Sequence, residues 1–285
     1  MILVSGATGT TGGQVVRHLS ERGAEFRALA HSDESAAKLR EQGVDAVVGD
    51  FDAPDSLTAA LEGADHAFLV TPPHEGQVQW EGGFIDAAKH AGVDHVVKLS
   101  VIGADPEASV RLARGHAQSE QHLRDSGVGY TLLRPNGFME NFLANAGSIA
   151  SDGIFYSSIG NAQVSWVAAS DIGGAAAAAL TEEGHMGKTY ELTGPSAVSY
   201  EELARTLSDK LGKEVRHQQV PDDDARAAML GMGMGEWLVG GLVELFEVYR
   251  AGYASGVQSG VTDASGRDPE PFEEWIELNR AAFED

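Results

Sequence analysis

The first 22 residues, MILVSGATGTTGGQVVRHLSER (Met1–Arg22), decide the expected fold. An apolar run at residues 2–4 has strand character, a glycine-rich turn follows at 6–13, and a helix is expected over 12–22. Glycines suit this turn because the chain bends sharply and a pyrophosphate must approach its backbone at a helix N-terminus. The turn therefore predicts a dinucleotide-binding unit. A nucleoside-triphosphate loop is rejected, because no Lys-Ser or Lys-Thr pair follows the glycines.

The same alternation of strand and helix continues to about residue 136. Strands alternating with helices at this pitch predict right-handed crossovers and a parallel sheet that is covered on both faces. We therefore expect a Rossmann-type, doubly wound α/β fold with a mostly parallel sheet. The expected strands are 26–30, 46–48, 66–70, 96–99 and 130–133, and the expected helices are 34–42, 56–61, 82–91 and 115–125.

After residue 136 the polar loops become longer. Helices are expected at 173–180, 200–211, 223–232, 237–249 and 271–283, with strands at 189–193 and 215–220. Residues 254–267 are rich in Gly, Ser and Thr and are expected to form a loop. This pattern predicts an NAD(P)-binding domain over 1–150, which returns to its sheet near 160–195. A smaller α+β subdomain on the substrate side is expected over 196–285.

Charge and composition exclude several classes of protein. With 20 Lys+Arg against 43 Asp+Glu, the net charge of −23 repels a nucleic-acid backbone. Zero cysteines exclude disulfides and thiolate chemistry. We expect no secretory signal, because the sequence starts directly with a strand-like apolar run, and no membrane span, because no apolar run reaches ~18 residues. We expect a cytoplasmic monomer or homodimer with no nucleic-acid or membrane partner. No metal site is expected, because Asp222–Asp224 read as a helix start.

Several motifs together resemble the NmrA-like family of atypical short-chain dehydrogenases/reductases. They are GATGTTGG at 6–13, VGDF at 48–51, VKLS at 97–100, TLLRPN at 131–136 and WVAASDI at 166–172. Members of that family include NAD(P)H-dependent quinone reductases, triphenylmethane-dye reductases and redox-sensing regulators. The resemblance therefore implies a nicotinamide cofactor more firmly than it implies a reaction.

The resemblance also implies positions for the cofactor's parts. Asp50 and Phe51 would flank the adenine, and Thr71 and Pro72 would touch the ribose and the nicotinamide. The pyrophosphate would be held by Gly6, Thr8, Gly9, Thr10, Thr11 and Gly12.

The end of the second expected strand bears on the choice of cofactor. An acid there bonds the ribose 2′-hydroxyl of NAD, whereas the 2′-phosphate of NADP needs a cationic partner. This chain has His31 and Ser32, which can bond a phosphate, and many relatives carry an arginine there. We therefore expect NADP(H) to be preferred. Asp33 leaves NAD(H) open, and a solvated loop histidine is the alternative interpretation of His31.

The source of a proton is not the usual one. Short-chain dehydrogenases commonly use a Tyr-x-x-x-Lys pair, and none of the six tyrosines here has a lysine four residues later. The resemblance places His116 where relatives carry a nicotinamide-proximal lysine or histidine, and an imidazole near neutrality suits a proton donor. The alternative is a surface His116 paired with Glu120. Ser100 would either donate to a substrate oxygen or cap its loop.

Residues after the sixth expected strand are candidates for the nicotinamide and substrate side. Pro135 and Asn136 are expected beside the nicotinamide, with Arg134 as a loop anchor. Phe138, Met139 and Phe142 are expected to line an apolar substrate mouth, and burial in the core is the alternative.

The expected function is hydride transfer from NAD(P)H to a small quinone, enone or other conjugated or carbonyl acceptor. Two alternatives stay open. One is a non-catalytic regulator that senses NADP(H) and binds a protein partner, and the other is an isomerase or biosynthetic enzyme of the same fold.

Overall fold

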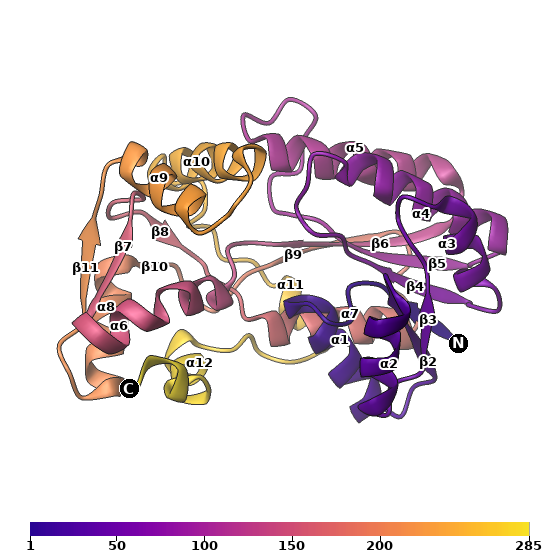
Figure 1. Cartoon of the computed structure of the whole chain (residues 1–285), viewed down its shortest axis with the longest axis horizontal. Helices are drawn as coiled ribbons and strands as arrows, with labels where there is room; N and C mark the ends of the chain where they lie inside the picture. The colour runs from indigo at the N-terminus through magenta and orange to yellow at the C-terminus, as the bar shows by residue number, and fades with distance from the viewer. Residues whose placement is uncertain (285) are drawn as a thin grey trace.

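A seven-stranded sheet forms the centre of the computed structural model, which describes residues 1–284 (Figure 1). Its strand order is β3-β2-β1-β4-β5-β6-β9, and every neighbouring pair is parallel. This order confirms the predicted doubly wound α/β fold. The strands are β1 (Ile2–Val4), β2 (Phe26–Ala30), β3 (Ala46–Val48), β4 (His66–Leu69), β5 (His95–Leu99), β6 (Gly129–Pro135) and β9 (Lys188–Leu192).

Helices cover both faces of this sheet. One face carries α3 (Pro54–Leu61), α4 (Gln77–Ala91) and α5 (Arg111–Ser126). The other carries α1 (Thr10–Glu21), α2 (Asp33–Glu41), α7 (Ala169–Thr181) and α11 (Gly260–Ser265). The alanines and glycines of α7 let it lie directly on α1, since a Cβ at Gly173 would come within 2.6 Å of the Gln14 Cβ. The central strands β1, β4 and β5 are almost completely buried, which explains their largely apolar runs, whereas the edge strands β3 and β9 are partly exposed.

A second hydrophobic core lies at the left of Figure 1, beyond β6. Phe142 is at its centre and packs edge-on against Phe155, Trp166, Tyr200 and Phe272, with ring centroids 5.1–6.1 Å apart. Two small sheets contribute, one pairing β7 (Ile154–Ser157) with β11 (Arg216–Gln219) and the other pairing β8 (Gln163–Val164) with β10 (Val198–Ser199). The helices of this region are α6 (Ala146–Asp152), α8 (Tyr200–Leu211), α9 (Asp222–Gly231), α10 (Glu236–Arg250) and α12 (Phe272–Leu278), with 3₁₀ turns at Met139–Asn145 and Arg280–Phe283.

Several local predictions are wrong. Residues 260–265 form helix α11 rather than loop, because Gly260 lets this segment lie against β9, where a Cβ would come within 2.1 Å of the Glu191 carbonyl oxygen. The expected helix over 271–283 stops at Leu278 and resumes as a 3₁₀ turn. Helix α4 begins five residues earlier than predicted, because the polar Gln77 and Glu81 of its first turns are buried rather than exposed. Among the described helices, none has the length and apolar character needed to cross a bilayer.

Candidate functional site

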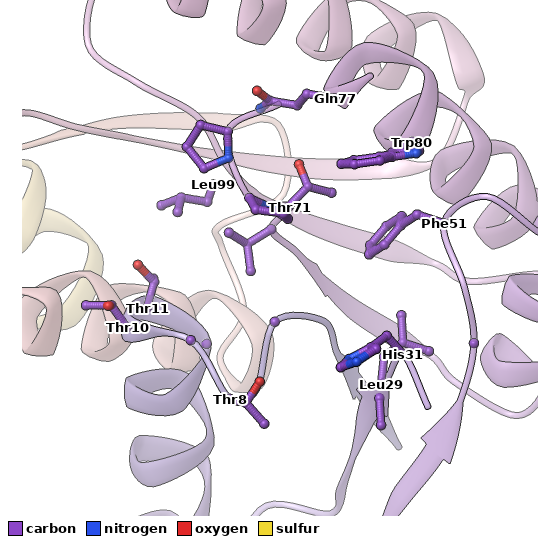
Figure 2. Close-up of a pocket in the computed structure, with 18 of the residues that line it drawn as sticks. Thr8, Thr10, Thr11, Leu29, His31, Phe51, Thr71, Gln77, Trp80 and Leu99 are labelled. Atoms are coloured by element: carbon purple, nitrogen blue, oxygen red, sulfur yellow. The ribbon is translucent and has the colours of Figure 1, made fainter. Parts of the chain in front are cut away.

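A cavity of about 780 Å³ opens at the carboxyl-terminal edge of the main sheet, beside the ends of β1, β2, β4 and β5 (Figure 2). The strand order reverses between β1 and β4, and the crevice at such a reversal is the usual ligand site of doubly wound folds. Its volume falls in the range of roughly 300–1,000 Å³ typical of small-molecule sites.

The glycine-rich turn forms one wall, and all six residues expected to hold a pyrophosphate border the cavity. Gly6 has a positive φ of 63°, and Gly9 is the N-cap of α1. A Cβ at Gly12 would lie only 2.1 Å from the Gly6 carbonyl oxygen, so the turn closes this tightly only with glycine. The first N–H groups of a helix have no partner within it, and the N-terminal residues Thr10, Thr11 and Gly12 of α1 border the cavity. The turn therefore fits a dinucleotide pyrophosphate.

An aromatic and polar end of the cavity lies beyond the tip of β2, at the right of Figure 2. Phe51 and Trp80 lie with ring centroids 6.5 Å apart, and the Trp80 indole N–H donates to Asp52 at 2.7 Å. The exposed His31 ring borders this end, as do Asp50 and Ser35.

Ser32 does not border the cavity, because its hydroxyl caps helix α2. It accepts a hydrogen bond from the Ser35 backbone N–H at 3.2 Å, and the Ser35 side chain accepts one from the Ser32 N–H. Ser35 is instead the hydroxyl beside His31, with its Oγ 3.4 Å from the His31 Nδ1. Sequence reasoning missed Ser35, although the Ser-x-x-Ser spacing of a capping box is a signal that could have found it.

Thr71, Gln77 and His116 also line the cavity, and Figure 2 shows the first two. A buried ion pair, which does not itself line the cavity, lies behind them. The Thr71 hydroxyl donates to Glu81 Oε1 at 3.0 Å, and the Gln77 amide donates to the same oxygen at 3.1 Å. Glu81 in turn pairs with the fully buried Lys98 at 2.9 Å. Burial alone would raise the pKa of the Glu81 carboxyl, but the charge of Lys98 outweighs it and holds that pKa below its usual range. Sequence reasoning identified neither Glu81 nor Lys98.

His116 is partly exposed, borders the cavity and contacts this ion pair from α5. Its Nδ1 lies 3.2 Å from the Lys98 Nζ. Burial, reinforced by the positive charge of Lys98, lowers the pKa of His116 to about 4. The imidazole is therefore neutral at physiological pH, which differs from the near-neutral titration expected from the sequence.

Ser100 and Glu120 form a separate buried cluster at the end of β5. The Ser100 hydroxyl donates to Glu120 Oε1 at 2.5 Å, and the Arg134 guanidinium donates to both Glu120 oxygens at 2.9 and 2.6 Å. Burial opposes the charge of Glu120, but the hydrogen bonds from Arg134 and Ser100 lower its pKa. Glu120 is thus bound to Arg134 and Ser100, and no hydrogen bond joins it to His116. Arg134 anchors this edge and also donates to the Ala104 carbonyl at 3.2 Å.

The candidates after β6 divide between the cavity and the core. Phe138 borders the cavity. Pro135 is buried in the β6–β9 pairing, and the Asn136 amide donates to Ser165 Oγ and the Ala254 carbonyl, both at 2.8 Å. Met139 and Phe142 belong to the second core, which is the alternative that the sequence left open. None of these last four residues borders the cavity.

The remaining expected residues, Asp50, Phe51, Thr71 and Pro72, all border the cavity. Within the described chain, no group of three or more His, Asp or Glu side chains is placed to hold a metal ion.

Comparison with known proteins agrees with this arrangement. The model of the NmrA-like family matches residues 1–276. This chain belongs to the NmrA-like family. It is 40% identical over 283 residues to the NAD(P)H azoreductase of Xenophilus azovorans, covering 99% of both chains.

Two solved structures support the same assignment to the NmrA-like family. The NADPH-dependent quinone oxidoreductase of Escherichia coli, complexed with NADPH, superposes with a TM-score of 0.88 at 30% identity, covering 98% of this chain and 100% of that one. The triphenylmethane reductase of Citrobacter sp., complexed with NADP(H), gives a TM-score of 0.86 at 29% identity over 97% and 99% of the two chains.

Proposed function

We propose that this NmrA-like protein is an NAD(P)H-dependent reductase that prefers NADP(H). The observation that carries the proposal is one continuous cavity, which joins the glycine-rich turn and His31 to a second end lined by Ser100 and His116. A dinucleotide needs the first end and a reducible acceptor needs the second. The 40% identity to an NAD(P)H azoreductase over nearly the whole chain supports the same assignment.

Different residues of the cavity bind different parts of the cofactor. The glycine-rich turn binds the pyrophosphate through backbone N–H groups, and Asp50 and Phe51 flank the adenine. His31 and Ser35 are the groups placed to bond a 2′-phosphate, and neither Lys nor Arg occurs among the residues that line the cavity. Thr71 and Pro72 contact the nicotinamide side, where the Thr71 hydroxyl hydrogen is already donated to Glu81. The bound cofactor supplies a hydride.

The acceptor end fits a small conjugated molecule. Leu99, Val101 and Phe138 give it apolar walls, and His116 is its partly exposed polar group. Ser100 also borders it, but its hydroxyl hydrogen is already donated to Glu120. A second hollow of about 400 Å³ shares Pro73 with the cavity and is lined by Trp237 and Leu238 of α10. We therefore place a quinone, an enone or another conjugated or carbonyl acceptor at this end, with the second-core region covering it. A neutral His116 bonds an acceptor oxygen without adding charge to the site.

Steady-state NADPH oxidation, followed by its absorbance, tests this proposal with a panel of quinones, enones and dyes. We expect turnover with at least one quinone. We also expect His116→Ala to lower kcat by about 10²-fold, the low end of general-acid effects. His122→Ala is the matched control, because His122 lies on the same helix α5 but pairs with Asp86 outside the cavity. Tight NADPH binding without turnover of any acceptor would contradict the proposal and favour a sensor.

A further inference from the structure

We propose that Lys98 is a positioning residue that fixes His116 as an Nε2–H donor and replaces the proton that His116 gives to the reduced acceptor. The inference rests on the proposed reductase function. It assigns a role to a buried ion pair, Lys98 with Glu81, that the binding of cofactor and acceptor does not use.

The Lys98 ammonium has three close partners. Its Nζ lies 2.9 Å from Glu81 Oε2, 2.9 Å from the Leu99 carbonyl oxygen and 3.2 Å from His116 Nδ1. An ammonium has N–H donors and no acceptor, so Lys98 is the donor in its hydrogen bonds to Leu99 and His116, while its contact with Glu81 is an ion pair. One Lys98 N–H therefore points at His116 Nδ1, which must be the unprotonated nitrogen of the ring. The neutral ring then carries its hydrogen on Nε2.

Gln77 does not by itself select a tautomer of His116. Its amide nitrogen has two N–H donors, of which one goes to Glu81 Oε1, where the Thr71 hydroxyl also donates. The other faces the His116 ring, but the amide nitrogen lies 3.3 Å from both ring nitrogens, so it does not discriminate between them. Glu81 is therefore held as a carboxylate, and it supplies the opposite charge that a completely buried lysine side chain needs.

The chemistry of the acceptor requires such a neighbour. Hydride addition to a quinone or an enone leaves an oxyanion, which needs one proton. A neutral imidazole is a poor acid unless its other nitrogen gains a proton as the first one leaves. In the proposed step, the bond from His116 Nε2 to its hydrogen breaks as that hydrogen bonds to the acceptor oxygen. A proton passes from Lys98 Nζ to His116 Nδ1 at the same time. Lys98 is left as a neutral amine. After product release, a solvent proton binds His116 Nε2 from the cavity, and the Nδ1 proton returns to Lys98.

Two kinds of acceptor separate this role from a purely structural one. A quinone needs a hydride and a proton, whereas a triarylmethyl cation dye needs only the hydride, because the product is already neutral. We expect Lys98→Met to lower kcat with the quinone by about 10²-fold and to leave kcat with the cationic dye within about twofold. Lys89→Met is the matched control, since Lys89 is an exposed lysine at the end of α4, and it should change neither value. A change of less than about tenfold in the ratio of the two kcat values would overturn the inference.

A measurement without turnover tests the same contact. In ¹⁵N-imidazole NMR of the cofactor-free protein near pH 7, with the signal assigned by its loss in His116→Ala, His116 should show a protonated Nε2 and an unprotonated Nδ1. Lys98→Met should populate both tautomers. If that variant does not fold with Glu81 left unpaired, the double variant Lys98→Met/Glu81→Gln removes both charges and is expected to give the same two results. A protonated Nδ1 in the wild-type protein would refute the role of Lys98. Failure of the wild type to reduce either acceptor would refute the reductase proposal alone.

Discussion

Two adjacent glycines in the turn offer a matched test of how the dinucleotide site is built. An added Cβ at Gly12 would lie 2.1 Å from the Gly6 oxygen, 1.3 Å inside the 3.4 Å at which ordinary contact begins. The atoms it meets are backbone, and the turn is closed by a hydrogen bond from the Gly9 N–H to that same oxygen at 2.8 Å. An added Cβ at Gly13 would meet only the Ala7 oxygen, at 3.5 Å. The two adjacent glycines therefore differ in the space available for a Cβ atom, although they lie at almost the same place in the turn.

The expected effects have opposite signs. Gly12→Ala should lower the free energy of unfolding by about 3 kcal/mol, because backbone must move to accept the methyl group. Gly13→Ala should raise it by about 0.5–1 kcal/mol, since alanine is the better helix former and Gly13 lies inside α1. For NADPH, displacement of the turn in Gly12→Ala should break about two charge-assisted hydrogen bonds of ~1.5 kcal/mol each, which raises Kd by about 10²-fold.

Urea unfolding and fluorescence titration with NADPH measure both quantities on the same samples. Gly13→Ala serves as the internal control and should bind NADPH as the wild type does. The steric account is refuted if Gly12→Ala unfolds within about 1 kcal/mol of the wild type, or if the two variants bind NADPH equally well.

Two further predictions concern charge. His31→Asp should raise the ratio of the Kd for NADP⁺ to that for NAD⁺ by about tenfold or more, because a carboxylate repels the 2′-phosphate and bonds a 2′-hydroxyl. His90→Asp, an exposed change at the far end of α4, should leave the ratio unchanged, and an equal shift in both variants would remove His31 from the phosphate site. Burial raises the pKa of Asp171 to about 6 and that of Glu270 to about 7, so their ionisation opposes folding as the pH rises from about 4 to 7. The double variant Asp171→Asn/Glu270→Gln should therefore gain stability over the wild type by about 3 kcal/mol between pH 4 and pH 8 in urea unfolding, and a constant difference across that range would contradict this assignment.

The parts of the site that follow local rules could be predicted from the sequence. The turn Gly6–Gly13 has a fixed spacing between a strand and a helix, so its place at the cavity follows from chain order alone. The ends of β2 and β4 carry His31 and Thr71 to the same edge for the same reason. These positions depend on where each strand ends, and the end of each apolar run in the sequence predicts that point.

Side-chain contacts between different helices, strands and turns could not be predicted in this way. The i,i+4 spacing suggested a pair between His116 and Glu120, but the Glu120 carboxylate bonds Arg134 from the neighbouring strand instead. Met139 and Phe142 look like a substrate wall until the 3₁₀ turn directs them into the second core. The partner of Glu120 and the burial of Met139 and Phe142 depend on which helix, strand or turn packs against each residue. A single sequence does not predict that packing.

Lys98 shows how a conflict within the sequence could have pointed to function. A lysine inside the run HVVKL, in a strand covered on both faces, has no route to water, and such a charge persists only when it is paired.

The net charge of −23 also bears on how an anionic dinucleotide could bind, because few cations are available to attract it. Lys98 and Arg134 pair with Glu81 and Glu120, and neither Lys nor Arg occurs among the residues that line the cavity. In the proposed function, the N–H groups of the α1 turn and His31 are therefore the groups that attract the dinucleotide, and the proposed role of Lys98 concerns the proton of the acceptor.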